Sequence, residues 1–347
     1  MKQIRAIVID DSAFMRKVIS DILASDPRVN VIATGRNGED GIKKIRELQP
    51  DVVTLDVHMP VMDGIEALSI IMKERPTPVV MLSSETKEGA IKAIQAISNG
   101  AVDFITKPSG PISLDIRNIQ HEIISKVVTA SQVNMNKNQL RKAADCQVKA
   151  PVKKYHDKTI ITIGTSTGGP RALQQVLISI SESFTAPILI VQHMPARFTK
   201  SLAERLNTLS PIRVKEAVHG EIIEKSTAYI APGDFHMTVN KIGTSLAICL
   251  SKDVPVKGHR PSVDTLFRSI AGLKRINKIA IVLTGMGNDG AAGIIEMKKQ
   301  DPNTIVLAES EETSIVYGMP KAAAQTGYVN QVLTLNQFGP VLDELTK

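Results

Sequence analysis

Short apolar runs recur along this chain, and the segments between them are long enough to form a helix each. Five runs lie in the first 125 residues: AIVI (6–9), VIAT (31–34), VVTL (52–55), VVML (79–82) and DFIT (103–106). Strands that alternate with helical crossovers lie parallel in one sheet. The pattern therefore predicts a doubly wound α/β domain of flavodoxin-like size over residues 1–125.

A second series of apolar runs begins at residue 159. Its members are TIITIG (159–164), PILIVQ (187–192), AYIAP (228–232), SLAICL (245–250), IAIVLTG (279–285) and TIVLAE (304–309). Helical patterns lie between them, as at 172–180 and 291–299. We therefore expect a second doubly wound, parallel-sheet domain, Rossmann-like, over residues 158–347, with residues 126–157 as the connection.

The connecting segment carries most of the excess charge. The chain has a formal net charge of +7, and residues 137–158 contain seven basic residues but only two acidic ones. We favour a solvated basic linker, with an arm that binds acidic surfaces as the alternative. A DNA-binding regulator is disfavoured, because neither domain shows a helix-turn-helix pattern. No nucleic-acid partner is expected.

The first residues, the apolar runs and the cysteine content indicate a cytoplasmic protein. Two carboxylates, Asp10 and Asp11, stand close to the first residue, so no signal peptide is expected at the start of the chain. The apolar runs are all shorter than the roughly 18 residues that span a bilayer, so no membrane insertion is expected. Cys146 and Cys249 are too few for a disulfide framework, which fits a reducing compartment.

Acidic and basic residues gather at the predicted strand ends of the first domain. Asp10 and Asp11 follow the first strand, Asp56 ends the third, Ser83 ends the fourth and Lys107 follows the fifth. The carboxyl ends of parallel strands share one edge, so these groups are expected to converge. Clustered carboxylates favour a hard divalent ion such as Mg²⁺. With Lys107 it would offset the charge of a phosphoryl group attacked by Asp56.

This segment resembles the response-regulator receiver family over residues 3–125. The resemblance implies that Asp56 is the phosphoacceptor. It also implies that Asp10, Asp11, Asp56 and the backbone of His58 hold Mg²⁺. Ser83, Phe104 and Lys107 would sense or bind the phosphoryl group.

In the second domain, three strand ends carry the residue types of a hydrolytic triad. They place Ser166 in TSTGGP, His193 in QHMP and Asp289 in GMGNDG. A serine hydroxyl needs a base, and the base needs an orienting carboxylate. The chain order Ser, His, Asp differs from other triads, but geometry and role define a triad. The three residues predict a serine hydrolase.

A competing interpretation uses GMGNDG (285–290) as a dinucleotide-binding loop. The segment matches G-x-G-x-x-G, follows a strand, precedes a helix, and has Glu309 about 20 residues downstream. Against it, Asp289 would press a carboxylate toward a pyrophosphate, and the motif lies in mid-domain. A receiver-controlled dinucleotide enzyme therefore remains the alternative function.

Five motifs carry a second resemblance: GTSTGGPRAL, VQHMP, RPSVD, LTGMGNDG and YGMPKAA. With them, residues 158–347 resemble the catalytic domain of the bacterial chemotaxis protein-glutamate methylesterase (CheB) family. The resemblance implies hydrolysis of glutamate γ-methyl esters on chemoreceptors and deamidation of receptor glutamines. It assigns Ser166 as nucleophile, His193 as general base and acid, and Asp289 as orienting group. The backbone N–H groups of Met286 and Thr167 would form the oxyanion hole.

The same resemblance implies how the enzyme is regulated. A chemotaxis histidine kinase would donate the phosphoryl group to Asp56. The unphosphorylated receiver would pack over the catalytic domain, and phosphorylation would loosen that contact. No cofactor is expected for the ester hydrolysis itself. His219, His236 and His259 receive no role; for His259, which precedes RPSVD, we favour a structural role over a place beside the site.

Overall fold

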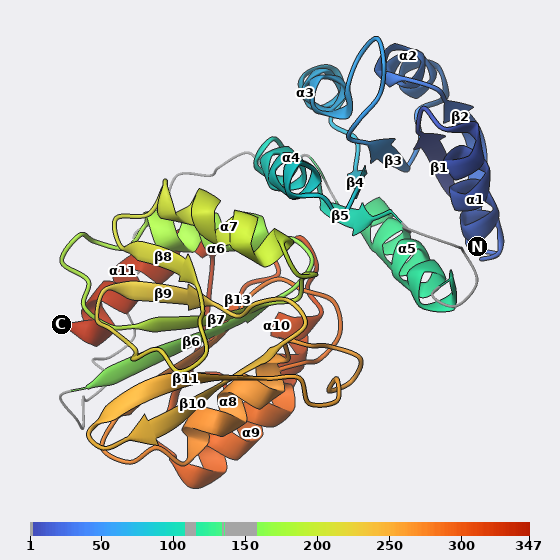
Figure 1. Cartoon of the computed structure of the whole chain (residues 1–347). Coiled ribbons are helices and arrows are strands. Elements are labelled where there is room, and N and C mark those ends of the chain that lie inside the picture. Colours follow the sequence, from blue (N-terminus) through green and yellow to red (C-terminus); the bar gives the residue numbers. More distant parts are fainter. Residues whose placement is uncertain (1–2, 108–115, 134, 136–157) are drawn as a thin grey trace. The chain divides into compact units, whose positions relative to one another are not determined.

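The computed structural model describes residues 3–107, 116–133, 135 and 158–347 (Figure 1). The chain divides into two compact units, Met1–Gln139 and Leu140–Lys347. Most of the predicted linker, residues 136–157, lies outside the described residues. Among the described residues, no helix has both the length and the apolar character of a bilayer span.

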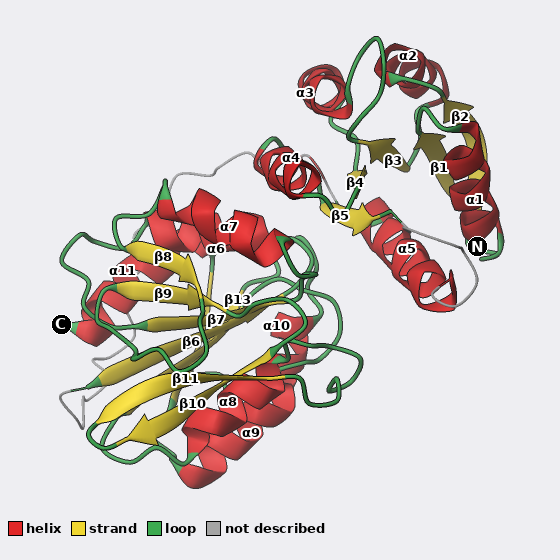
Figure 2. Ribbon diagram, in the orientation of Figure 1, coloured by secondary structure: helices red, strands yellow, loops and turns green. Residues whose placement is uncertain are grey.

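The N-terminal unit is a five-stranded parallel sheet in the order β2-β1-β3-β4-β5 (Figure 2). This is the flavodoxin-like order, and all five predicted strands are confirmed. Its elements are β1 (Ile4–Ile9), α1 (Ala13–Ala24), β2 (Val29–Gly35), α2 (Gly38–Leu48), β3 (Val52–Asp56), α3 (Gly64–Glu74), β4 (Val79–Ser83), α4 (Lys87–Ser98), β5 (Asp103–Thr106) and α5 (Ile116–Ser131). Strands β3 and β4 are buried throughout, as expected for a parallel sheet covered on both faces.

The C-terminal unit contains a seven-stranded parallel sheet in the order β14-β13-β12-β6-β7-β9-β8. An antiparallel pair, β10-β11, lies beside it. The elements are β6 (Thr159–Thr165), α6 (Gly169–Ile178), β7 (Ile188–Gln192), α7 (Phe198–Asn207), β8 (Arg213–Glu216), β9 (Thr227–Ile230), β10 (His236–Ile242), β11 (Ser245–Ser251), α8 (Val263–Ala271), β12 (Asn277–Val282), α9 (Ala291–Gln300), β13 (Ile305–Glu309), α10 (Met319–Gln325), β14 (Gln331–Leu333) and α11 (Leu335–Thr346).

Three strands of this unit were missing from the sequence prediction. β8 and β14 are the two edge strands, and both are short and partly exposed, so neither shows a continuous apolar run. β10 alternates polar and apolar residues because one of its faces is exposed. The predicted strand at 245–250 exists as β11, but it pairs antiparallel with β10 instead of joining the parallel sheet.

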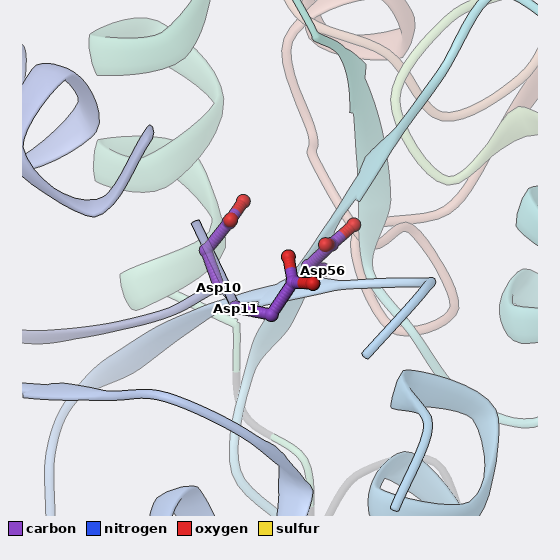
Figure 3. A group of neighbouring side chains, drawn as sticks. All are labelled: Asp10, Asp11 and Asp56. Atoms are coloured by element: carbon purple, nitrogen blue, oxygen red, sulfur yellow. The ribbon is translucent and has the colours of Figure 1, made fainter. Parts of the chain in front are cut away.

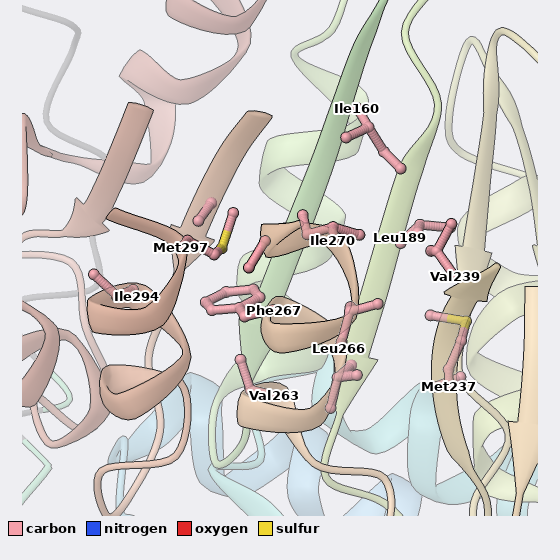
Figure 4. Close-up of a cluster of buried hydrophobic side chains, with 14 of the residues drawn as sticks. Ile160, Leu189, Met237, Val239, Val263, Leu266, Phe267, Ile270, Ile294 and Met297 are labelled. Carbon is pink, nitrogen blue, oxygen red and sulfur yellow. The ribbon is translucent and has the colours of Figure 1, made fainter. Parts of the chain in front are cut away.

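A core of apolar side chains fixes α8 against the sheet (Figure 4). Leu266, Phe267 and Ile270 of α8 are fully buried in this cluster, together with residues of β6, β7, β10 and α9. Burying each such side chain contributes about 1.5–3 kcal/mol. Val263, at the start of α8, lies close to Gly164 of β6. A Cβ atom on Gly164 would lie 2.3 Å from Val263 Cγ1. The beginning of α8 is thereby held tightly to the end of β6.

The order of the strands creates a natural place for a site. β6 is flanked by β7 on one side and β12 on the other, so the connections from these neighbouring strands diverge there. In open α/β sheets, ligands bind beyond the carboxyl ends of strands at such a switch point. Ser166, His193 and Asp289 follow β6, β7 and β12.

Candidate active site

Ser166 begins a tight turn between β6 and α6. Its backbone N–H donates to the Thr284 carbonyl at 3.0 Å, and the Thr165 hydroxyl donates to the same oxygen at 2.7 Å. Gly168 has φ +79°, and a Cβ there would lie 2.6 Å from Cβ of Ile315, so only glycine fits. These constraints fix the serine at the end of its strand.

His193 directly follows β7, the strand next to β6, just as Ser166 directly follows β6. Thr165 of β6 pairs with Gln192 of β7, and the His193 N–H donates to the Thr165 carbonyl at 3.1 Å. Gln192 is buried, and its Nε2 donates to the carbonyls of Ser166 at 3.0 Å and of His193 at 3.2 Å. One amide side chain therefore ties the backbone of the serine to that of the histidine.

Asp289 lies in the loop between β12 and α9 and is 2% exposed. Its Oδ2 accepts from Val263 N at 2.7 Å, and its Oδ1 accepts from Asp264 N at 2.9 Å and Ser262 Oγ at 3.0 Å. Burial by itself would raise the pKa of Asp289. The hydrogen bond and charge of His193, with the two backbone donors, outweigh burial and lower that pKa. The carboxylate is therefore ionised at neutral pH.

The imidazole of His193 is bound at one nitrogen and open at the other. Nε2 lies 2.9 Å from Asp289 Oδ2, so it carries the proton that the carboxylate accepts. Nδ1 is buried and has no hydrogen-bond partner within the described part of the chain. The lone pair of a neutral imidazole then sits on Nδ1. This is the arrangement of a general base already oriented by a carboxylate.

A second cluster lies at the strand ends of the N-terminal unit (Figure 3). Asp10, Asp11 and Asp56 each offer an oxygen, and these oxygens all lie within 4.8 Å of one another. Lys107 Nζ contacts Asp10 Oδ2 and Asp56 Oδ2, both at 2.7 Å. Burial lowers the pKa of Lys107, but these two carboxylates outweigh it and raise the pKa. The ammonium therefore stays charged beside them.

Burial dominates the ionisation of Asp56. It raises the pKa of Asp56, and the charge of Asp10 adds to this effect, while the hydrogen bond and charge of Lys107 oppose it. The net result is a raised pKa. The His58 N–H donates to Asp56 Oδ1 at 3.3 Å, which brings the backbone of His58 to the cluster. A cation among three carboxylates would relieve their mutual repulsion.

Ser83 and Phe104 are the remaining receiver residues to which the sequence analysis gave a role. Ser83 is fully buried at the end of β4, the strand that pairs with β3. Phe104, in β5, is 2% exposed, and Lys126 Nζ lies 5.1 Å from its ring centroid. A role for Phe104 in sensing stays a prediction.

Comparisons with known proteins match a family to each of the two units. The family model of the CheB methylesterase matches residues 161–342, and that of the response regulator receiver domain matches residues 6–118. The chain belongs to the CheB methylesterase family.

Individual CheB relatives match along nearly the whole chain. The protein-glutamate methylesterase/protein-glutamine glutaminase of Oceanobacillus iheyensis is 59% identical over 97% of this chain and 97% of its own. The protein of the same name from Bacillus subtilis is 46% identical over 95% of this chain and 94% of its own. The crystal structure of the Thermotoga maritima CheB methylesterase catalytic domain covers 54% of this chain and 98% of that chain, with 40% identity and a TM-score of 0.52.

The structure of this CheB chain argues against the dinucleotide interpretation of GMGNDG. The N–H groups of Gly290 and Gly293, at the start of α9, donate to Asp264 Oδ1 at 2.9 and 2.7 Å. These amides are therefore not available to a pyrophosphate. Glu309, the expected ribose ligand, is fully buried and accepts from Thr284 N at 2.7 Å. The residues of the supposed fingerprint serve the internal structure of the site instead.

Sequence reasoning missed the residues that support the triad. RPSVD was recognised as a motif, but its Ser262 and Asp264 received no role. Both donate to Asp289, and the Asp264 carboxylate also accepts from the N–H groups at the start of α9. Ser262 also caps α8, and a Ser before an amphipathic run is a recognisable helix start. For His259 a structural role was favoured over a place beside the site; its ring stacks on that of His193, so it does lie beside the site. His219 and His236 lie elsewhere, bonded to Leu250 N and Val254 O.

Proposed function

We propose that this chain removes methyl groups from γ-methyl-esterified glutamates of chemoreceptors and deamidates receptor glutamines, with Ser166, His193 and Asp289 as its triad. Relatives that span the whole chain carry the name of both activities. The observation that carries the assignment is the His193–Asp289 hydrogen bond, which leaves Nδ1 as the basic nitrogen. A buried, oriented base beside a strand-end serine suits acyl transfer.

Acylation begins when Ser166 Oγ attacks the ester carbonyl carbon and its proton passes to His193 Nδ1. The ionised Asp289 stabilises the imidazolium through Nε2–H. The proton then moves from Nδ1 to the departing methoxide, which leaves as methanol. In deacylation a water molecule gives a proton to Nδ1 as its oxygen attacks the acyl-serine. The proton on Nδ1 then passes to Ser166 Oγ as the acyl–oxygen bond breaks, which restores the serine hydroxyl and releases the glutamate side chain, whose carboxyl group loses its proton to solvent. A glutamine side chain follows the same steps with ammonia as leaving group.

The backbone N–H groups of Thr167 and Met286 form the oxyanion hole in this proposal. Thr167 follows the nucleophile and precedes α6, whose positive N-terminal end favours an anion. Gly285 brings the second loop close: a Cβ on it would lie 2.8 Å from Cβ of Ser166. Each such donor is worth on the order of 10²–10³ in rate.

Asp56 is the phosphoacceptor in the proposed regulatory reaction, and a chemotaxis histidine kinase is the donor. Mg²⁺ would be held by Asp10, Asp11, Asp56 and the His58 carbonyl, where its charge would stabilise the transferred phosphoryl group. The cluster fits such an ion, because its hard oxygen atoms lie within 4.8 Å of one another and their charge exceeds that of Lys107. Lys107 would then pair with a phosphoryl oxygen.

The proposal also assigns parts of the chain to the two functions. The sequence predicted a receiver over residues 1–125 and a linker over 126–157, but α5 continues to Ser131, so we place the end of the receiver after that helix. The catalytic unit begins at β6. Phosphorylation of the receiver relieves its inhibition of the catalytic unit. Both the kinase and the receptor helices are cytoplasmic partners, so we propose the cytoplasm as the place of action.

Release of labelled methanol from a methyl-labelled chemoreceptor tests this function. We expect release by the intact chain and none above background by Ser166→Ala, while the variant keeps its receiver phosphorylation. Ser183→Ala is the matched control, because Ser183 is an exposed serine of the same unit that bonds only to Ser181 among the described residues. Undiminished release by Ser166→Ala would remove the nucleophile assignment.

A further inference from the structure

The imidazole of His259 lies flat against that of His193. The two ring centroids are 3.9 Å apart, and the ring planes differ by 7°. The His193 side chain is 8% exposed, so His259 covers one face of a ring that is already largely buried. His193 is thus held at its edge by Asp289 and on one face by His259.

Two backbone hydrogen bonds and an ion pair fix the segment that carries His259. The backbone groups of Val256 and His259 exchange two hydrogen bonds, at 3.0 and 2.9 Å, across Lys257 and Gly258. Both of these residues have positive φ, as in a two-residue hairpin turn of the I′ type. Lys257 Nζ contacts Asp264 Oδ2 at 3.1 Å. The ring of His259 therefore rests on a fixed backbone.

The same segment supplies the donors that hold Asp289. Ser262 Oγ and the N–H of Val263 bind the carboxylate only a few residues beyond His259. Residues 256–264, which we call the clamp segment, therefore contact both partners of the His193–Asp289 pair. Because one segment contacts both groups, the carboxylate of Asp289 and the ring of His259 keep fixed positions relative to each other.

The surroundings keep His259 uncharged at neutral pH. Burial and the charge of His193 lower the pKa of His259, Lys257 adds to this, and Asp289 opposes it; the result is about 4. An uncharged aromatic face is compatible with an imidazolium beside it, and its π electrons attract the cation. A second cation at 3.9 Å would instead repel it.

We propose that His259 is a positioning residue for the esterase reaction, because its ring fixes the plane of His193. The inference rests on the proposed triad. With the plane fixed, Nε2 stays on Asp289 and Nδ1 keeps one position for the proposed proton transfers. Without the stacked ring, His193 gains rotational freedom and water reaches its face. Misplacement of a catalytic group by about 1 Å can cost on the order of a hundredfold in rate.

Three substitutions separate stacking from other roles. His259→Ala removes the ring, His259→Asn keeps a polar side chain without a ring, and His259→Phe keeps a flat ring without its nitrogens. With methyl-labelled receptor as substrate, we expect kcat to fall about tenfold to a hundredfold in the Ala and Asn variants, with KM nearly unchanged. The Phe variant should recover to within about threefold of the unaltered chain.

His219→Ala serves as control, because His219 accepts a bond from Leu250 N and lies outside the site. Unfolding temperatures of all variants identify any loss of folded protein, and rates are compared per folded molecule. Unaltered kcat in His259→Ala, or a Phe variant as slow as the Ala variant, would overturn the proposal. Either result leaves the Ser166 test untouched. An unaltered chain that releases no methanol would instead reject the proposed function itself.

Discussion

His193 Nε2 and Asp289 Oδ2 are 2.9 Å apart, and this pair decides which imidazole nitrogen is available for chemistry. In chymotrypsin the aspartate binds Nδ1 and the serine faces Nε2. Here the carboxylate contacts Nε2 instead, and Nδ1 is buried and free of any hydrogen bond within the described residues. The roles that we propose are nevertheless the same, because both arrangements leave one nitrogen for the carboxylate and one for the hydroxyl.

Asp289→Asn should lower kcat by ~10⁴, as loss of the orienting carboxylate does in other triads. Both oxygens of Asp289 accept from N–H or O–H donors, so an amide NH₂ group must face a donor whichever way it is turned. The imidazole would then lose its fixed tautomer. Methanol release measures the effect. Asp253→Asn, a substitution of an exposed carboxylate in the same unit, is the control. A loss of less than about tenfold would contradict the assigned role.

Gln192→Leu should lower kcat about tenfold to a hundredfold, because the nucleophile and the base lose the amide that links their backbones. Leucine fills similar space but donates to neither the Ser166 nor the His193 carbonyl. The effect should appear in kcat more than in KM, since no contact with substrate is removed. Gln325→Leu, at an exposed position of α10, provides the comparison. Equal kcat in the two variants would show that the link is dispensable.

Asp56→Asn should abolish stimulation by a small phosphodonor with Mg²⁺ and leave the unstimulated esterase rate in place. The amide cannot form the acyl phosphate, and it weakens the pairing with Lys107 Nζ. Methanol release with and without phosphodonor gives the stimulation factor. Asp21→Asn, an exposed residue of α1 paired with Lys17, should respond like the unaltered chain. Full stimulation of Asp56→Asn would exclude Asp56 as the phosphoacceptor.

The sequence predicted the parallel sheets and their site edges because buried strands and strand-end polar residues leave local signals. Ser166 and His193 follow their strands directly, and Asp289 lies in the loop that follows β12, so topology alone brings the three to one edge of the sheet. The same holds for Asp10, Asp56 and Lys107.

The supporting contacts were not predictable in this way. The stack of His259 on His193 joins a hairpin turn to a strand end, and nothing in the spacing of the two residues indicates it. The Gln192 amide bonds depend on rotamers, which sequence periodicity does not report. The edge strands β8 and β14 were not predicted, because partial exposure removes the apolar run that marks a strand.

Glu309 gives the C-terminal unit a stability that should decrease as pH rises. Its carboxyl group is fully buried, accepts from Thr284 N at 2.7 Å and from the Thr313 hydroxyl at 3.0 Å, and reaches the site through Thr284, whose carbonyl holds Ser166 N. Burial raises the pKa of Glu309 from 4.5 to about 7, although Thr284, Thr313 and Ser314 lower it by hydrogen bonding.

The sign of the effect follows from where the proton is bound. Between pH 4.5 and about 7 the folded chain keeps a proton that the unfolded chain has lost. The stabilisation is complete below 4.5 and is lost as pH rises through about 7. The Glu309→Gln variant has no titrating group at position 309. Its free energy of unfolding should therefore fall less between pH 5 and pH 8 than that of the unaltered chain.

Urea unfolding of the C-terminal unit at several pH values, followed by circular dichroism, measures the difference. Glu312→Gln, an exposed neighbour in the same loop, should keep the pH dependence of the unaltered chain. If Glu309→Gln also keeps it, the carboxyl group does not bind a proton in the folded state near neutral pH. In that case the charged carboxylate must be stabilised by its three hydroxyl and amide donors against the full cost of burial.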